Sequence, residues 1–333
     1  MNLNRRSYEI KLVTPAFLAG ADQQQPELRV PSIRGCLRWW FRLAEHGAGT
    51  SLEQIRKKES DLFGSTDKGQ RLILRIRPDG PLKAETPSYR DLPFDHQYLW
   101  FPLRPERNSS QPITRPALAA GTSFKLEAIV PPSIQNGEQV LRQLDDLVAQ
   151  WVLFGSIGMR SRRCAGSLWF SSQLPSGSSM PAGKTNIERT LGDARKSLPI
   201  ELVVGSESFA KWQDAVKAAG NHYRGQRTKV KENKGRMALP GLGWPIMKYR
   251  GANGDKIIVD GHDSERLASP AMLKVIPDGQ KFRWLLVVIK RPFVDWIKSG
   301  EGEVRQAEVV GNFAQGFETA SAPQPSFSRG PRR

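Results

Sequence analysis

The order of strand-like and helix-like segments in the first half of the chain is the feature that most restricts its fold. Alternating polar and apolar residues predict half-buried strands, whereas apolar residues spaced three and four apart predict amphipathic helices. The expected strands lie at 7–13, 71–77, 122–130 and 167–170, and the expected helices at 33–47, 52–62 and 139–154. With the first two helices taken as one crossover, this is the split βαβ pattern of a ferredoxin-like domain.

The second half of the chain predicts a further, more decorated copy of this topology. A strand is expected at 200–204, a helix at 209–219, and two strands at 272–276 and 282–289. The predicted class is therefore α+β, with two ferredoxin-like domains packed in one chain, a topology that RNA-recognition modules share. We expect the domains at 1–190 and 195–318, and a disordered tail rich in Ser, Pro and Gly at 319–333.

The charge balance restricts the partner rather than the fold. The chain holds 50 Lys and Arg against 33 Asp and Glu, which gives a net charge of +17. Such a surplus favours a polyanionic partner, most simply nucleic acid.

Few residues are available for disulfide, metal or membrane chemistry. Two cysteines and four histidines are too few and too scattered for a disulfide scaffold, a CxxC zinc site or a multi-His cluster, so we expect no metal and no cofactor. The N-terminus shows no apolar signal segment, and the longest strongly apolar run, 284–289, is far shorter than the ~20 residues of a membrane helix. We therefore expect a cytoplasmic protein with no membrane partner.

A first basic cluster lies on the helix predicted at 33–47. Apolar residues occupy one face of this helix, and arginines repeat every four residues on another. Trp39 lies beyond both faces and could stack on a base, and Ser32 is expected to cap the helix. The alternative is a solvated arginine face with a partly buried tryptophan. The residues proposed to contact RNA here are Ser32, Arg34, Arg38, Trp39 and Arg42.

A second basic cluster lies in the glycine-rich turn 155–167. Glycines allow a close backbone approach to a ligand, and arginines bind phosphates or stack on bases. No Asp or Glu occurs from 147 to 187, so nothing nearby in sequence neutralises the turn. The alternative is that its arginines pair with carboxylates of the preceding helix. The proposed RNA contacts are Gly158, Arg160, Arg162, Arg163 and Gly166.

A third basic cluster falls between 211 and 250, a stretch that contains ten basic and two acidic residues. Much of this stretch lacks apolar periodicity, which predicts a basic loop at 221–250 that orders on a polyanion. A solubilising surface loop is the alternative. The proposed RNA contacts are Arg224, Arg227, Lys229, Lys231 and Arg236.

The sequence is also compatible with two other functions. His222 or Tyr223 could serve a metal-independent endoribonuclease that processes guide RNA. Alternatively, Trp39 and the apolar segment 99–101 could dock acidic protein partners in a purely structural subunit.

Several blocks of the sequence resemble one known family. The blocks are Thr14-Pro15-Ala-Phe17-Leu-Ala-Gly20-Ala-Asp22, Glu27-Leu28-Arg29, Pro31-Ser32-Ile-Arg34-Gly35-Cys-Leu-Arg38-Trp39-Trp40, Asp61-Leu-Phe63-Gly64-Ser65, the turn 155–167 and Arg266-Leu-Ala-Ser269-Pro270. They are similar to the RAMP superfamily, the RNA-binding subunits of CRISPR effector complexes. The combination is most similar to the first subunit of the Cmr module of type III-B. The blocks span roughly residues 8 to 275, so the resemblance covers most of the chain.

The resemblance implies a function as well as a fold. It implies a non-catalytic subunit that holds the 3′ region of a CRISPR guide RNA, a single-stranded target RNA, or both, beside other RAMP subunits of the Cmr complex. Such a subunit would hold phosphates and leave specificity to base pairing. By position, Ser32, Arg34 and Arg38 belong to the family's N-terminal RNA-facing motif, and the turn 155–167 to its glycine-rich loop. Cys164 stands where the family usually has glycine, so a positive φ there would cost about 1 kcal/mol or more.

Overall fold

The chain forms two compact units in the computed structural model. The structure describes residues 4–66, 69, 71–87, 89–103, 116–196, 198–234, 239, 241–243, 257–259, 262–264, 267–290, 296–299 and 302–318. Unit 1 comprises residues 1–221 and 271–291, and unit 2 comprises residues 222–270 and 292–333. The expected domain limits, 1–190 and 195–318, stay a prediction.

The first sheet of unit 1 has the ferredoxin-like strand order. Its four antiparallel strands lie in the order β2 (Ile73–Pro78), β5 (Ser123–Val130), β1 (Asn4–Leu12) and β6 (Leu168–Phe170). The register places Ile10 of β1 opposite Phe124 of β5 and Phe170 of β6. All four strands were predicted from the sequence, and the split βαβ topology of this half is confirmed.

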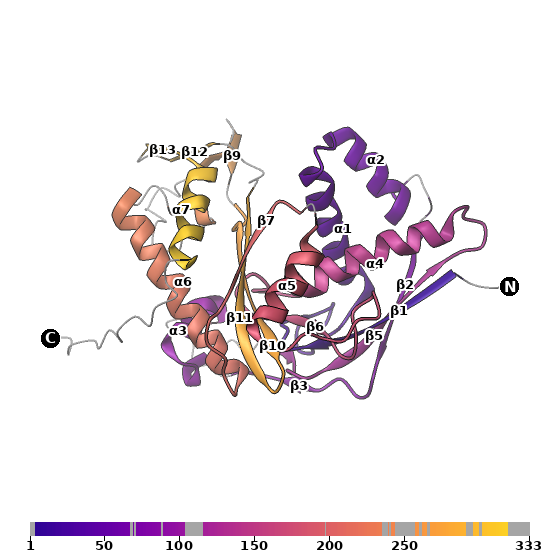
Figure 1. The fold of residues 1–333 in the computed structure, drawn as a ribbon, viewed down its shortest axis with the longest axis horizontal. Coiled ribbons are helices and arrows are strands. Elements are labelled where there is room, and N and C mark those ends of the chain that lie inside the picture. Colours follow the sequence, from indigo (N-terminus) through magenta and orange to yellow (C-terminus); the bar gives the residue numbers. More distant parts are fainter. Residues whose placement is uncertain are drawn as a thin grey trace. The chain divides into compact units, whose positions relative to one another are not determined.

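Two long helices cover one face of this sheet (Figure 1). They are α1 (Val30–Gly47) and α4 (Gly137–Phe154), and both bury large aromatic residues, Trp40 and Trp151, in the core. α1 begins at Val30 with Arg29 as its N-cap and no capping side chain. The prediction that Ser32 caps the helix is therefore wrong, because Pro31 in the first turn favours an earlier start.

The crossover also contains α2 (Leu52–Phe63), whose two ends are clearly specified. Ser51 and Gln54 form a capping box at the N-terminus. Gly64 follows the last residue with a φ of 81°, a conformation that glycine adopts without strain. These two signals define where α2 begins and where it ends.

The second sheet of unit 1 is built from the later part of the chain. Its antiparallel strands lie in the order β10 (Ala271–Asp278), β11 (Lys281–Ile289) and β7 (Ile200–Val204). In chain order these are the second, third and first strands of a ferredoxin-like sheet, and the described residues contain no fourth strand beside β7. The strands predicted at 200–204, 272–276 and 282–289 are confirmed.

Unit 1 has further elements that the sequence did not predict. They are β3 (Ala84–Glu85), α3 (Phe94–Leu99), β4 (Ala117–Leu118) and α5 (Lys184–Arg195), with single 3₁₀ turns at Tyr89–Asp91 and Phe101–Leu103. The segment 99–101 is not the exposed apolar strip that a docking surface would need, because Leu99 and Trp100 are fully buried.

Helix α6 (Trp212–Lys234) replaces most of the predicted basic loop. The helix expected at 209–219 continues to Lys234, so the loop prediction is wrong for residues 221–234. Tyr223, Gln226 and Val230 recur at helical spacing and are buried, which explains why this charged stretch folds as a helix. Residues 235–238, 240 and 244–250, including Arg236, lie outside the described residues.

Unit 2 contains the end of α6, a small antiparallel sheet and a final helix. The sheet order is β13 (Gly302–Arg305), β12 (Trp296–Ser299), β8 (Ile257–Val259) and β9 (His262–Ser264), and the helix is α7 (Gln306–Glu318). Tyr223 packs edge-on against Phe313 of α7, and the Gln226 amide donates a hydrogen bond to the Gly316 carbonyl at 2.6 Å. The predicted tail 319–333 lies outside the described residues.

Candidate nucleic-acid interface

The three arginines of α1 differ in how far their charges are neutralised. Arg42 forms a bidentate ion pair with Glu59 of α2, with N–O distances of 2.6 and 2.7 Å. Arg38 donates a hydrogen bond to the Gly64 carbonyl at 2.6 Å and lies 3.5 Å from Glu59. Arg34 has no ion pair or hydrogen bond with any described residue. The stripe therefore ends in one uncompensated charge.

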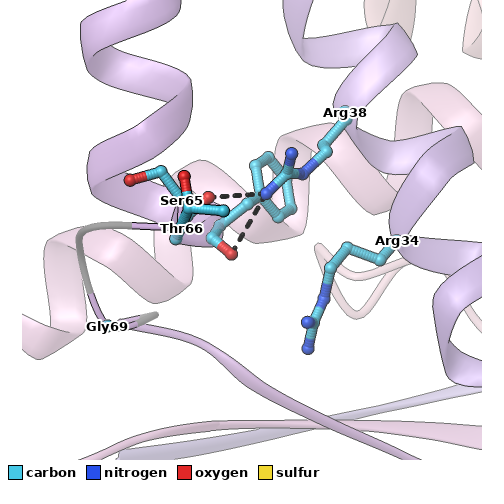
Figure 2. Close-up of a pocket in the computed structure, with 7 residues that line it drawn as sticks. Arg34, Arg38, Ser65, Thr66 and Gly69 are labelled. Carbon is cyan, nitrogen blue, oxygen red and sulfur yellow. Dashed lines mark hydrogen bonds between the residues drawn. The ribbon is translucent and has the colours of Figure 1, made fainter.

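Arg34 and Arg38 line a cavity of about 450 Å³ that is open to solvent. Its other walls come from the end of α2 and the segment after it, including Ser65 and Thr66. Figure 2 shows Arg38 bonded to carbonyl oxygens of this segment, whereas the Arg34 guanidinium extends into the open space. Burial and the nearby charge of Arg38 lower the pKa of Arg34. Both effects disfavour the charged form of the Arg34 guanidinium, and an anion bound here would offset them by favouring that charge.

The turn at 155–167, called the arginine loop below, has a backbone that requires its glycines. Gly158 and Gly166 adopt φ values of 89° and 59°. A Cβ atom would lie 2.6 Å from the Phe17 carbonyl oxygen at the first position and 1.9 Å from the Ile157 carbonyl oxygen at the second. The sequence indicated that these glycines allow the backbone to approach a ligand closely. In the structure they allow it to pack closely against other backbone groups of the protein itself. Cys164, at the position where the resemblance implies glycine, has a φ of 67° and so adopts the left-handed conformation.

Arg160 and Arg163 are anchored to backbone carbonyls. Arg160 donates from Nε to the Leu99 carbonyl at 2.8 Å, and its guanidinium lies 5.2 Å from the ring centre of Phe101. Arg163 is 8% exposed and donates to the carbonyls of Ala271 and Arg162 at 2.8 and 2.7 Å. Neither contact involves a carboxylate of the preceding helix. The assignment of Gly158, Arg160, Arg163 and Gly166 as RNA contacts stays a prediction.

Arg162 joins the arginine loop to α1. Its guanidinium lies 5.2 Å from the ring centre of Trp39, which itself packs edge-on against Trp40. Burial, and then the charge of Arg163, lower the pKa of Arg162 to about 10, so it remains cationic at neutral pH. The fold thus brings together two clusters that lie more than a hundred residues apart in sequence. Trp39 is half-buried under Arg162 rather than open on both faces.

The described residues proposed as RNA contacts in the third cluster lie on α6. Lys229 and Lys231 are exposed, and Arg227 lies 5.9 Å from the ring centre of Tyr223. Arg224 and Arg227 are half-buried on the same helix. The RNA contacts predicted on α6 stay predictions, as do those of Ser32, Arg34, Arg38, Trp39 and Arg42 on α1.

One buried lysine beneath the arginine loop escaped the sequence analysis. Lys274 lies in β10, is 1% exposed and donates hydrogen bonds to three backbone carbonyls. A signal was present, because a lysine interrupts the apolar run Ala-Met-Leu-Lys-Val-Ile of a buried strand.

Within the described residues, no group of three His, Cys, Asp or Glu side chains could hold a metal ion. Tyr223 is 1% exposed and belongs to the core, and the His222 ring lies 6.4 Å from that of Phe317. Among the described helices, none combines the length and the apolar character needed to cross a bilayer.

Comparisons with known sequences support the resemblance noted above. The model of the RAMP superfamily matches residues 9–169. The Pyrococcus furiosus protein named CRISPR system Cmr subunit Cmr1-1 is 30% identical over 166 residues, which are 48% of this chain and 46% of that protein. The subunit named Cmr1-2 from the same organism is 26% identical over 172 residues, 48% of this chain and 92% of that protein. The match thus spans about half the length of the first relative and most of the second.

Solved structures with a similar fold cover nearly the whole chain. The crystal structure of Cmr1 from Pyrococcus furiosus in its apo form superposes with a TM-score of 0.59 at 19% identity, covering 96% of this chain and 97% of that one. A chain in the cryo-EM structure of the type III-B Cmr-beta complex bound to cognate target RNA gives a TM-score of 0.61 at 14% identity, covering 97% and 100%. At these identities the likeness establishes the fold, which agrees with two ferredoxin-like domains.

Proposed function

We propose that the chain is a non-catalytic RNA-binding subunit of a type III-B CRISPR effector complex, a proposal supported by the match of residues 9–169 to the model of the RAMP superfamily. In this role it holds the 3′ region of a guide RNA, a single-stranded target RNA, or both, beside other RAMP subunits in the cytoplasm. The similarity to the two Cmr1 subunits of Pyrococcus furiosus supports this assignment.

The observation that carries the proposal is the uncompensated Arg34 in the cavity between α1 and α2. Its charge is half-buried, lacks a carboxylate among the described residues and is repelled by Arg38. A phosphate is the ligand that best offsets such a charge, because a guanidinium binds phosphate oxygens in a bidentate manner. The arginine loop adjoins this helix through Trp39 and Arg162, which provides further cations for the neighbouring phosphates.

The mechanism is positional rather than chemical. Contacts to phosphates fix the path of the strand and carry no sequence information, so the choice of target is left to base pairing between guide and target. Three or more contacts along one strand would also order a flexible RNA at the end of a complex. This division of labour requires no catalytic group on this chain.

Substitution of Arg34 tests the proposal directly. We expect Arg34→Gln to weaken binding of single-stranded RNA by the full-length chain by about tenfold at moderate salt, because one phosphate contact is lost. The slope of log K against log salt should become shallower by about 0.7, the value for one phosphate of a single strand. Fluorescence anisotropy with labelled RNA over a series of salt concentrations measures both quantities.

Arg189→Gln is the matched control for this experiment. It removes the same charge from an exposed position on α5 and should change the affinity by less than about twofold. Equal losses in the two variants would mean that net charge, not a site at Arg34, governs binding. A wild-type affinity that does not depend on salt would overturn the proposed function itself.

A further inference from the structure

Lys274 is the most unusual buried group in the described part of the chain. Its Nζ atom lies 2.7 Å from the Val152 carbonyl oxygen, 2.8 Å from that of Gly155 and 3.0 Å from that of Leu168. The side chain is 1% exposed, and no described carboxylate pairs with it. A charged group without a counter-ion in a protein interior is costly, so it requires a structural explanation.

The three acceptors account for the charge of Lys274. Burial lowers its pKa, but only the protonated amine has three N–H groups to give to three carbonyls. The Val152 carbonyl is one of the last four of α4, which have no partner within the helix and form its negative end. The lysine therefore acts as a buried C-terminal cap for α4.

The other two acceptors lie at the two ends of the arginine loop. Gly155 is the first residue of the loop, and Leu168 directly follows its last residue. One ammonium group thus links the point where the chain enters the loop to the point where it leaves. No other described side chain donates to both of these carbonyls.

The backbone of β10 continues this support along the loop. Leu273 accepts a hydrogen bond from the Cys164 amide at 2.8 Å and donates one to the Arg162 carbonyl at 3.1 Å. The Val275 amide donates to the Ser167 hydroxyl at 3.0 Å. Together with the Arg163 contact to Ala271, these bonds place the loop along one edge of β10.

We propose that Lys274 is a positioning residue for RNA binding, which closes the two ends of the arginine loop and thereby holds Arg160 and Arg162 in place. The inference rests on the proposed function, since the loop is taken to face RNA. It adds that the second sheet sets the geometry of this part of the interface. A cap that merely stabilises α4 would not affect the charges that RNA meets.

Lys274→Met is the principal test, because it keeps the length of the side chain and removes every N–H group. We expect amides of the arginine loop such as Met159, Cys164 and Gly166 to exchange at least about tenfold faster in the RNA-free protein, while those of β1 and β5 are unchanged. RNA affinity should fall by about tenfold or more, and the salt slope should become shallower by about 0.7 for each arginine that loses its phosphate.

Two control variants separate positioning from charge and from stability. Lys281→Met removes the same charge at an exposed position of the β10–β11 hairpin and should leave loop exchange and RNA affinity within about twofold of the wild type. Leu191→Ala opens the buried side of α5 and should lower the melting temperature without changing loop exchange or the salt slope.

The outcomes are distinguishable. If Lys274→Met lowers the melting temperature as Leu191→Ala does, with loop exchange and salt slope unchanged, Lys274 is only a helix cap and the inference is overturned. If the wild type binds RNA without salt dependence, the proposed function fails, whereas loop exchange still reports on the support by Lys274. Should Lys274→Met not fold, Lys274→Gln, which retains two N–H donors but no charge, is subjected to the same measurements and the same criteria.

Discussion

At the scale of single residues, Cys164 holds a backbone conformation that L-residues avoid. Its φ of 67° lies in the left-handed region, and its side chain is fully buried. Its amide and carbonyl are both committed, the first to Leu273 and the second to Thr14. The hydrogen bonds therefore enforce a conformation that costs a non-glycine residue about 1 kcal/mol or more.

A pair of substitutions measures this strain. At most positions a protein with alanine is more stable than the same protein with glycine. At residue 164 we expect the reverse: the free energy of unfolding of Cys164→Gly should exceed that of Cys164→Ala by about 1 kcal/mol. Both variants lose the sulfur, so their difference reports the backbone preference together with one buried methyl group. Ala165→Gly, at a buried neighbour with an ordinary φ, should be destabilising. Urea denaturation gives the values, and the usual order at residue 164 would refute the assignment of strain.

The candidate site was predictable at this scale only in part. The arginines of α1 and of the loop are visible in the sequence, as is the glycine requirement of the turn. Their partners are not visible, because Glu59 neutralises Arg42 from another helix and Ala271 accepts from Arg163 across 108 residues. Only coordinates reveal that Arg34, among the three arginines of α1, keeps its charge uncompensated.

At the scale of elements, α3 shows how a segment without periodicity becomes part of the site. This short helix buries His96, whose ring packs edge-on against the rings of both Trp100 and Trp212. Its last residue, Leu99, accepts from Arg160, and the Trp100 indole donates to the Arg163 carbonyl at 2.8 Å. The packing around His96 therefore supports the arginine loop through a segment that precedes it in the chain, whereas β10 supports it through a segment that follows it.

His96 should make this support sensitive to acid. Burial lowers its pKa from 6.5 to about 4, so the unfolded chain binds the proton more readily than the folded protein. The contribution of neutral His96 to the free energy of unfolding is fully present above about pH 6.5. It falls by about 1.4 kcal/mol per pH unit as the pH drops towards 4, roughly 3 kcal/mol in all. Urea denaturation at several pH values measures the slope.

His96→Phe provides the comparison for this pH dependence. Phenylalanine keeps the aromatic packing against the two tryptophans and cannot be protonated. The variant should therefore lose less stability than the wild type between pH 6.5 and pH 4. Parallel curves for the two proteins would show that His96 is not the group that titrates.

Elements with a regular pattern and clear end signals were the ones that the sequence could predict. The strands of the first and second sheets of unit 1 and the helices α1, α2 and α4 fall close to their expected limits. Helix α6 was predicted as a loop beyond residue 220 because its high charge hid the apolar spacing of Tyr223 and Val230. The elements β3, β4 and α3 are too short to show any periodicity, and they form because unit 1 packs around them.

At the scale of the whole molecule, the surplus of positive charge favours a polyanionic partner. The net charge is +17, and the described residues contain no cluster suited to metal binding. The two residues considered for a metal-independent ribonuclease lie on α6, where Tyr223 is buried in contact with Phe313. A phenol in this position has no access to an RNA backbone.

We therefore expect the full-length chain to leave RNA intact. Incubation with CRISPR repeat RNA in EDTA should give no specific product on a denaturing gel, and His222→Ala should behave as the wild type does. A specific cleavage that disappears in His222→Ala would establish the endoribonuclease alternative instead. Arg34→Gln serves as a binding-deficient control, since any contaminating nuclease would be unaffected by it.

The dependence of the arginine loop on β10 also has a consequence for how the chain folds during its synthesis on the ribosome. Ribosomes release the loop long before they add Ala271, the acceptor for Arg163 that lies 108 residues later. A nascent chain can pair β1, β5 and β6 while its loop still lacks Lys274 and the edge of β10. The arginine loop can therefore reach its final conformation only late in translation. A polypeptide truncated before residue 271 lacks the contacts from β10 that hold the loop in this conformation.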